Sequence, residues 1–312
     1  MRAFLFPGQG SQAVGMGAAL SKASRAARDV FEQVDEALGQ NLFRLMREGP
    51  EDELKLTENA QPAIMAHALA VFAALTREGG VTFDKAAQFL AGHSLGEYSA
   101  LAAAGSFDLA TTAKLLKLRG QAMQAAVPVG IGAMAALLGT DLELARKIAA
   151  AAAQGEVCTV ANDNDPSQVV ISGHKGAIER AIEMAKEMGA KRALLLPVSA
   201  PFHCPLMQPA ADAMAGALGR IEIQTPIVPL YANVTAAPVA DPEIIREQLV
   251  EQVTGMVRWR ESIANMAAAG VEEFVELGGK VLGGMVKRIA PEVKMTSVVA
   301  IEDIEALAKE IA

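Results

Sequence analysis

The chain has 312 residues, of which 52% are hydrophobic, and a formal net charge of −8. This length and apolar content fit one large folded domain, or a large domain carrying a smaller one, and exclude a chain that is disordered throughout. The acidic balance argues against a nucleic-acid or anionic-membrane surface, no apolar run reaches membrane-spanning length, and two cysteines are too few for a disulfide framework.

The first predicted element is a buried strand at residues 4–6, which is followed by a polar, glycine-bearing loop at residues 7–12. Loops after the strands of an open α/β sheet face the ligand side, so this loop either lines a site or forms a plain turn. Its spacing fits neither a P-loop nor a dinucleotide fingerprint. Helical patterns follow at residues 24–38 and 59–77. His67 lies within the second and is expected to be a core or surface histidine with a local hydrogen bond.

A G-x-S-x-G motif at residues 92–96 lies between a short apolar segment, 87–91, and a run of helix formers, 97–104. Strand, sharp turn and helix form the context in which this motif indicates a nucleophile elbow, with Ser94 at its tip. The glycines permit a strained backbone, and the helix N-terminus favours a developing oxyanion. The alternative is an ordinary turn before a helix in an alanine-rich chain, and we favour the elbow.

The next predicted helix, residues 108–126, carries Arg119 within its apolar stripe, one turn after Leu115 and one turn before Met123. A guanidinium that points inward is costly unless it meets an acceptor. Periodicity leaves two interpretations open: a buried structural ion pair with an acidic side chain, or an anion-binding arginine that awaits a carboxylate.

Residues 128–198 change in character, and the predicted element order is β-α-β-β-α-β, as in a ferredoxin-like unit. The predicted strands are 131–138, 156–162, 168–172 and 191–198, the helices are 141–153 and 176–188, and a turn is predicted at 163–166. We therefore expect a small domain at 128–198 inserted into a large α/β domain formed by 1–127 and 199–312. The large domain is expected to be hydrolase-like, with a mostly parallel sheet.

The chain returns to the large domain through a proline-rigid loop, 197–205, that contains His203. An elbow serine needs a base, and serine before histidine is the order found in elbow hydrolases and acyltransferases. His93 adjoins Ser94 in sequence, so its side chain is expected to point elsewhere, and Cys204 lacks an elbow of its own. The remaining chain alternates helix and strand, which completes an α/β domain. Those predicted elements are 230–233, 242–253, 260–269, 273–277, 281–289, 295–299 and 301–311.

Four motifs occur in order along the chain: Gly-Gln-Gly-Ser-Gln at 8–12, the extended elbow motif at 92–101, Arg119, and Ala-Pro-Phe-His at 200–203. With them the chain resembles the malonyl-CoA:acyl carrier protein transacylases over nearly its whole length. The resemblance implies that Ser94 carries the malonyl group as an ester and that His203 takes and returns the proton. Phe202 lies just before that histidine. In related domains a phenylalanine at this position accompanies a preference for malonyl over branched acyl units.

The same resemblance implies the remaining site residues. The backbone N–H groups of Gln9 and Leu95 would form an oxyanion hole, the carbonyl of Gln252 would orient the histidine, and Arg119 would bind the malonyl carboxylate. One departure is the turn at 276–280, which reads Glu-Leu-Gly-Gly-Lys. Its Gly-Gly-Lys is one residue shorter than the Gly-Pro-Gly-Lys that the family usually has there, and it lacks the proline. Any role carried over for that loop is therefore in doubt.

The expected reaction is a ping-pong transfer from malonyl-CoA, as substrate, to the phosphopantetheine thiol of acyl carrier protein, in fatty acid synthesis. No metal or other cofactor is implied, and we expect a cytoplasmic monomer. Carrier proteins are acidic, so docking needs a local basic patch, for which Lys191-Arg192 and Lys287-Arg288 are candidates beside the alternative of ordinary solvated charges. Rival interpretations are an acyltransferase of a polyketide or malonate pathway, a serine thioesterase or hydrolase on the same elbow, and a non-catalytic scaffold.

Overall fold

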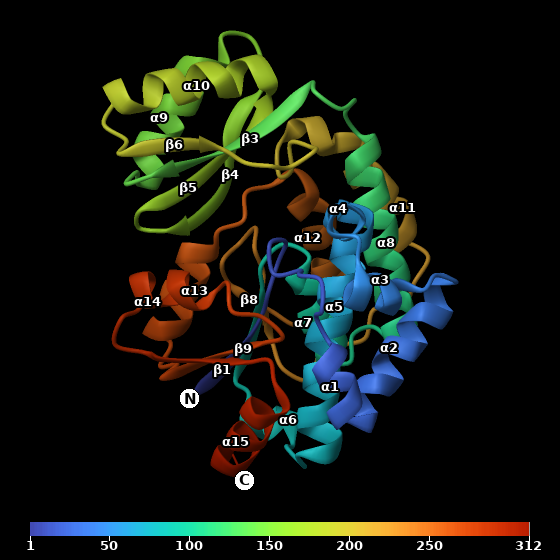
Figure 1. Ribbon diagram of the computed structural model, residues 1–312. Coiled ribbons are helices and arrows are strands. Elements are labelled where there is room, and N and C mark those ends of the chain that lie inside the picture. The colour runs from blue at the N-terminus through green and yellow to red at the C-terminus, as the bar shows by residue number, and fades with distance from the viewer. Residues whose placement is uncertain (312) are drawn as a thin grey trace.

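Two β-sheets organise the chain, and the computed structural model describes residues 1–311 of it. A six-stranded sheet lies in the body of the molecule, and a four-stranded sheet lies over one end of it (Figure 1). The strand order in the large sheet is β10-β9-β1-β2-β7-β8, with every neighbour parallel except the last pair. Its strands are β1 (Arg2–Phe6), β2 (Phe89–Gly92), β7 (Leu230–Tyr231), β8 (Pro238–Val239), β9 (Glu273–Leu277) and β10 (Lys294–Val298). The mixed α/β class and the mostly parallel sheet are thus as predicted.

Strand β1 occupies the middle of this sheet and is buried on both faces, which explains its unbroken apolar sequence. Phe4 and Phe6 enter the main core, while Ala3 and Leu5 face a second cluster around Trp259. Helices α13 (Trp259–Ala268) and α14 (Gly283–Ile289) supply that second cluster.

The helices that share the main core with Phe4 and Phe6 gather on the other side of the sheet (Figure 1). They are α1 (Ala18–Ala23), α2 (Arg25–Leu38), α3 (Leu42–Glu48), α4 (Glu51–Lys55), α5 (Thr57–Ala73), α6 (Phe83–Ala86), α7 (Gly96–Ala103), α8 (Leu109–Ala125), α11 (Gln208–Leu218), α12 (Pro242–Thr254) and α15 (Ile301–Ile311). A π-helical turn, Ala74–Glu78, extends α5, and a 3-10 turn, Pro205–Met207, precedes α11. The sequence reasoning missed α1, α3, α4, α6 and α11, most of which are short.

The smaller sheet contains β3 (Gly132–Leu138), β4 (Cys158–Asp165), β5 (Gln168–His174) and β6 (Arg192–Leu195), in the antiparallel order β4-β5-β3-β6. Helices α9 (Leu142–Ala153) and α10 (Lys175–Glu187) cover one of its faces and enclose a separate small core. Alternate residues of the same strands, among them Met134 and Val170, turn instead toward the main core. One face of the small sheet therefore lies over the large unit.

The predicted turn at 163–166 is wrong, because β4 continues through Asp165. Its Asn- and Asp-rich sequence is typical of turns, but partners distant in sequence stabilise it as a strand. The buried carboxylates of Asp163 and Asp165 pair with Arg260 and Arg288, at 2.8 and 2.7 Å. The N–H of Asp163 also donates to the Val257 carbonyl at 3.0 Å, which ties β4 to the large unit.

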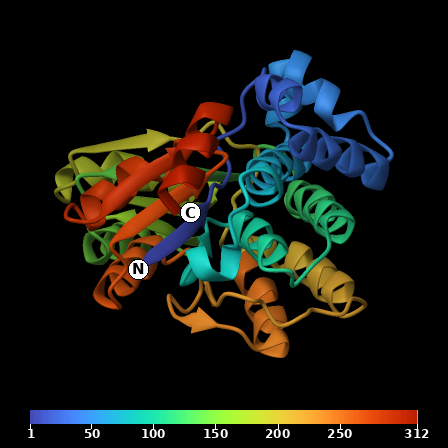
Figure 2. The ribbon, with the colours of Figure 1, turned by 90° about the horizontal axis from the view of Figure 1, so that it is seen from below.

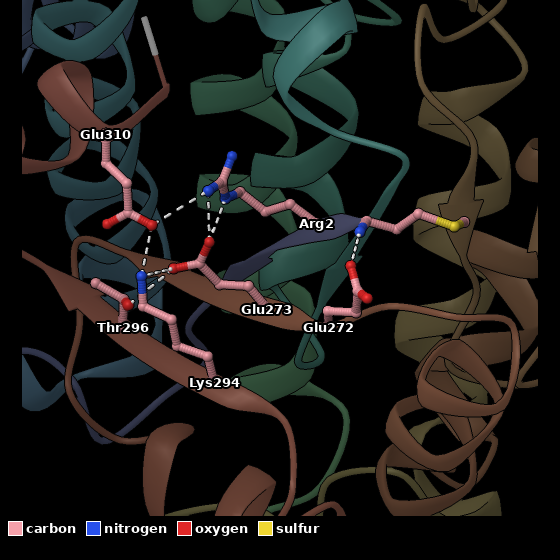
Figure 3. Close-up of polar contacts among 7 residues, drawn as sticks. Arg2, Glu272, Glu273, Lys294, Thr296 and Glu310 are labelled. Carbon is pink, nitrogen blue, oxygen red and sulfur yellow. Dashed lines mark hydrogen bonds and ion pairs between the residues drawn. The ribbon is translucent and has the colours of Figure 1, made fainter.

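The amino ends of the large-sheet strands carry a network of charged side chains (Figure 3). Arg2 contacts Glu273 and Glu310, and Lys294 contacts the same two carboxylates. These contacts join α15 to the sheet edge, and the two chain ends lie near each other in the view from below (Figure 2). Since ligands of parallel sheets bind beyond the opposite, carboxyl ends of the strands, we interpret this network as structural. Within the described residues, no helix is both long and apolar enough to cross a membrane.

Candidate active site

Ser94 lies in a sharp turn between β2 and α7, at the carboxyl edge of the large sheet. Its φ of 52° is in the left-handed region, which non-glycine residues seldom adopt and which costs about 1–3 kcal/mol. Strand and helix meet closely around it: a Cβ on Gly92 would lie 1.9 Å from the carbonyl carbon of Gly96, and one on Gly96 would lie 2.3 Å from the carbonyl oxygen of Phe6. The two glycines of the motif are thus required by close backbone packing.

The Ser94 hydroxyl is paired with His203, which lies on the loop that leads back from the small sheet. The distance from Ser94 Oγ to His203 Nε2 is 2.8 Å, and His203 Nδ1 lies 2.9 Å from the carbonyl oxygen of Gln252. A carbonyl can only accept, so Nδ1 carries the proton and Nε2 is free to accept from the serine. Burial, followed by the positive charge of Arg119, lowers the pKa of His203 to about 3. The imidazole is therefore a neutral base at physiological pH.

Arg119 reaches the same serine from α8 and is 1% exposed. Its Nη2 donates to Ser94 Oγ at 3.1 Å and to Gln252 Oε1 at 2.8 Å, and its Nη1 donates to Gln61 Oε1 at 2.8 Å. Within residues 1–311 its Nε is buried without a hydrogen-bond partner, and no acidic side chain pairs with it directly. This arrangement does not match the structural ion pair that the sequence left open. It leaves a buried cation with donor capacity beside the serine.

A cavity of about 410 Å³ opens over these groups, between the two sheets. Ser94, His203 and Arg119 line it, together with Gln9 and Leu95. Apolar walls come from Met123, Met134, Val170, Phe202, Leu282 and Met285, and polar contributions from the small sheet come from Asn162, Asn164 and Gln168. A mostly apolar cavity wall with a few convergent polar groups is typical of a small-molecule site.

The structure places all six residues predicted from the sequence in or beneath this cavity. Ser94, His203, Arg119 and Gln252 are joined by hydrogen bonds. The two residues predicted to supply backbone N–H groups, Gln9 and Leu95, lie on the cavity wall. Leu95 is the N-cap residue of α7, and the side chain of Gln9 accepts from Thr57 at 3.3 Å.

Four polar residues of the site were missed at the sequence level: Gln61, Glu97, Asn164 and Asn233. Asn233 accepts from the Ser94 N–H at 2.8 Å and donates to the Gly92 carbonyl at 2.7 Å, so it holds the turn from both sides. Its position at the end of the predicted strand 230–233 was an available signal, since polar residues at carboxyl ends of parallel strands commonly face the ligand side. Gln61 lies in the middle of a uniformly buried helix, and nothing in the local pattern distinguishes it.

Three further residues, His93, His67 and Cys204, do not belong to the hydrogen-bonded group around Ser94. His93 turns toward the small sheet and contacts Asn164 at 2.9 Å. His67 is buried and donates to the Gly278 carbonyl at 3.1 Å, a partner far away in sequence rather than the local one expected. Cys204 is fully buried, with its thiol 3.1 Å from the Pro201 carbonyl.

The shortened turn at 276–280 is held by a buried carboxylate. Glu276 accepts from the N–H groups of Val281 and Leu282 at 3.0 and 3.1 Å, and both of these residues line the cavity. The turn is therefore a structural support for one wall. Of the basic pairs considered for docking, all four residues are exposed, and Arg288 is also paired with the buried carboxylate of Asp165.

A neutral imidazole and a buried cation that both contact one serine hydroxyl are suited to nucleophilic attack on an acyl group that carries a negative charge. Among residues 1–311 no group of three or more histidine, cysteine, aspartate or glutamate side chains is placed to hold a metal ion.

Comparison with known proteins places this geometry in a family. A family model described as the acyl transferase domain matches residues 3–280, and the chain belongs to that family. It is 46% identical over 288 residues to the malonyl CoA-acyl carrier protein transacylase of Escherichia coli K12, with 92% of each chain covered. The crystal structure of an acyl-carrier-protein S-malonyltransferase from Bartonella henselae matches with a TM-score of 0.97 and 52% identity over 99% of both chains.

A third similar protein, a malonyl-transacylase solved in complex with a type II PKS acyl-carrier protein, matches with a TM-score of 0.95 and 40% identity over 99% of both chains. The resemblance that the sequence motifs indicated is thereby confirmed.

Proposed function

We propose that this chain transfers the malonyl group from malonyl-CoA to the phosphopantetheine thiol of an acyl carrier protein, through an ester on Ser94. One observation carries the proposal: Ser94 Oγ lies within hydrogen-bonding distance of both the His203 imidazole and the Arg119 guanidinium, in one cavity. The names of the similar proteins support the same activity.

In the first half-reaction, Ser94 Oγ attacks the thioester carbonyl while His203 Nε2 takes the hydroxyl proton. The C–O bond forms, and the carbonyl oxygen becomes an oxyanion that the backbone N–H groups of Leu95 and Gln9 would stabilise. Collapse breaks the C–S bond, and the leaving thiolate of coenzyme A takes the proton back from His203. The Gln252 carbonyl would hold the imidazole in the required tautomer throughout, as it does in the free site.

In the second half-reaction the carrier thiol gives its proton to His203 and attacks the Ser94 ester. The second tetrahedral intermediate collapses with cleavage of the C–O bond, and the proton returns to the serine oxygen. Both halves use one base and one oxyanion site, so the reaction is a ping-pong exchange without net hydrolysis.

Arg119 would select the acyl group by pairing with the free malonyl carboxylate. Its contact with Ser94 Oγ would bring that carboxylate close to the reacting carbonyl carbon. Phe202 lines the same cavity, and a phenylalanine at this position supports malonyl over branched acyl units.

The finer features of the fold belong to the same proposal. We assign the Ser94 turn as a hydrolase-like nucleophile elbow, residues 128–198 as an inserted ferredoxin-like domain, and 1–127 with 199–312 as the large domain. The antiparallel order β4-β5-β3-β6 and the separate core beneath α9 and α10 support this division.

The cellular setting is also proposed. Serine, imidazole and backbone groups supply all the chemistry above, so the reaction needs neither metal nor other cofactor. All these groups come from one chain, which fits a monomer. Two buried free cysteines, Cys158 and Cys204, fit the reducing cytoplasm, where fatty acid synthesis would use the product.

A second candidate differs only in the carrier. The likeness to a transacylase bound to a type II PKS carrier supports a polyketide carrier as acceptor, since the chemistry at Ser94 is the same. Parallel assays with both kinds of carrier distinguish the two. A serine hydrolase on the same elbow is disfavoured, because an esterase has no need of a buried cation beside its nucleophile.

The nucleophile is tested by intact-mass spectrometry after mixing with malonyl-CoA. The wild-type chain should gain one malonyl group, and Ser94→Ala should gain none. Ser99→Ala, on the adjoining helix α7, serves as the control. Labelling of Ser94→Ala to the wild-type level would reject the serine assignment.

A further inference from the structure

Glu97, in the first turn of α7, is a buried carboxylate that the mechanism above does not use. It is 2% exposed and lies three residues after the serine. One oxygen accepts from the backbone N–H of Asn233 at 2.5 Å, and the other accepts from Gln252 Nε2. A buried carboxyl group is costly unless it is fully hydrogen-bonded. Both contacts therefore constrain the groups that donate them, the Asn233 backbone and the Gln252 amide.

The first consequence concerns the orientation of the Gln252 side-chain amide. Its oxygen faces Arg119 Nη2 at 2.8 Å, while its nitrogen faces the Ser94 carbonyl at 2.9 Å and Glu97. Arginine can only donate, and a carbonyl or a carboxylate can only accept, so the three neighbours select one of the two amide orientations. A flipped amide would direct N–H groups at the guanidinium.

The second consequence concerns the turn that carries the nucleophile. Glu97 holds the backbone of Asn233, and the Asn233 side chain in turn brackets Ser94 through the contacts to the Ser94 N–H and the Gly92 carbonyl. One carboxylate thus supports both the arginine and the serine, each through a single intermediary.

The third consequence is electrostatic. Arg119 is buried without a direct acidic partner in the described chain, and a buried cation needs nearby negative charge or dipoles. Glu97 supplies polar carboxyl oxygens at one remove, oriented by the two donors that they accept from. A carboxylate in direct contact would occupy the donors that a substrate needs, whereas one relayed through Gln252 leaves them available. Burial raises the pKa of Glu97 to about 8, and the N–H of Asn233, the amide of Gln252 and the charge of Arg119 act in the opposite direction.

We infer that Glu97 is a positioning residue for malonyl recognition: through the Gln252 amide it holds Arg119 poised for the acyl carboxylate. The inference rests on the proposed malonyl transfer and deepens it, because it assigns selectivity to a residue that never touches the substrate.

The test compares malonyl-CoA with acetyl-CoA as acyl donors to Ser94, in the wild-type chain and in Glu97→Gln. The variant has nearly the same shape but places an NH₂ group where both neighbours donate, so either the Gln252 amide flips or the Asn233 contact is lost. We expect kcat/KM for malonyl transfer to fall about 10- to 100-fold, the range of one lost hydrogen bond to a charged group. Acetyl transfer has no carboxylate for Arg119 to bind, so it registers only the contact that supports the Ser94 turn and should fall by a smaller factor than malonyl transfer.

Glu97→Asp provides the second variant, and thermal melting shows whether each variant folds. Aspartate keeps the carboxyl group but shortens its reach, so the preference for malonyl over acetyl should fall by an intermediate factor. This variant tests the inference if Glu97→Gln does not fold. Equal losses on both donors, or no loss on either, would overturn the positioning role while a wild-type malonyl adduct upholds the proposed function. A wild-type chain that forms no malonyl adduct would overturn both.

Discussion

At the scale of single residues, the Ser94 hydroxyl is the meeting point of a base and a cation. It donates to a histidine whose tautomer is set by a backbone carbonyl, and it accepts from Arg119. The residues that set this geometry, Gln252 and Asn233, lie 158 and 139 positions away from Ser94 in sequence. Local sequence patterns can mark the serine, but they cannot show which distant amides hold it.

The selectivity assigned to Arg119 gives the first residue-scale prediction. Arg119→Ala removes the only cation proposed to bind the malonyl carboxylate, so malonyl transfer should fall at least about 30-fold, equivalent to about 2 kcal/mol or more. Acetyl transfer should fall much less. The exposed arginine variant Arg44→Ala serves as the control. Steady-state kcat/KM for both thioesters is the measurement, and equal losses would make Arg119 structural.

The lowered pKa of His203 gives the second residue-scale prediction. Burial and the charge of Arg119 lower the pKa of His203 to about 3. The free site therefore keeps a neutral imidazole at pH values well below 6.5, the ordinary pKa of histidine. Protonation, and loss of the base, begins only as the pH falls toward 3. The kcat/KM for Ser94 acylation should therefore be flat between about pH 5 and pH 8, as far as this histidine is concerned. An acid limb centred near 6.5 would show that His203 titrates as an exposed histidine.

At the scale of elements, the site depends on how closely β2 and α7 approach each other. Gly92 allows this approach, because any Cβ there would overlap the backbone of Gly96. The motif and its flanking strand and helix were readable from the sequence, and β2 and α7 lie within one residue or two of the predicted ranges. Element type was predictable here because apolar periodicity and turn chemistry agree over one continuous stretch.

Gly92→Ala tests this packing. The added methyl meets backbone rather than a flexible side chain, so the free energy of unfolding should fall by about 1–3 kcal/mol or more, and Ser94 acylation should be lost. Gly216→Ala is the matched control: it lies in α11 with nothing within 4 Å of the added Cβ. Alanine there should stabilise the chain by about 0.5–1 kcal/mol. Denaturant unfolding of the two variants is the measurement. An unchanged free energy of unfolding in Gly92→Ala would contradict the close approach of β2 and α7.

The end of strand β4 shows where element prediction failed. An Asn-Asp-Asn-Asp sequence favours a turn locally, and the countervailing partners, Arg260 and Arg288, lie 97 and 123 positions away from the aspartates they pair with. The alternation along this strand sends Asp163 and Asp165 to the arginines and Asn162 and Asn164 to the cavity. Tertiary pairing thus overrides a local preference at the point where the small sheet meets the site.

At the scale of the whole molecule, the alternation of helices and strands, the parallel sheet and the family were predictable from the sequence. The order of the strands, the seating of the small sheet on the main core and the polar groups beneath the serine were not, because each depends on contacts between distant segments. The cavity lies between the sheets, so both must be in place before Ser94, Arg119 and the small-sheet amides share one space.

The most direct test of malonyl transfer follows the acyl group by intact-mass spectrometry through both half-reactions. The chain is first mixed with malonyl-CoA, and holo acyl carrier protein is then added. The proposed mechanism predicts a malonyl adduct on Ser94 that moves to the carrier, leaving the chain at its original mass. An adduct lost as free malonate, with fatty acid and polyketide carriers both unmodified, would contradict the transferase assignment and indicate a hydrolase.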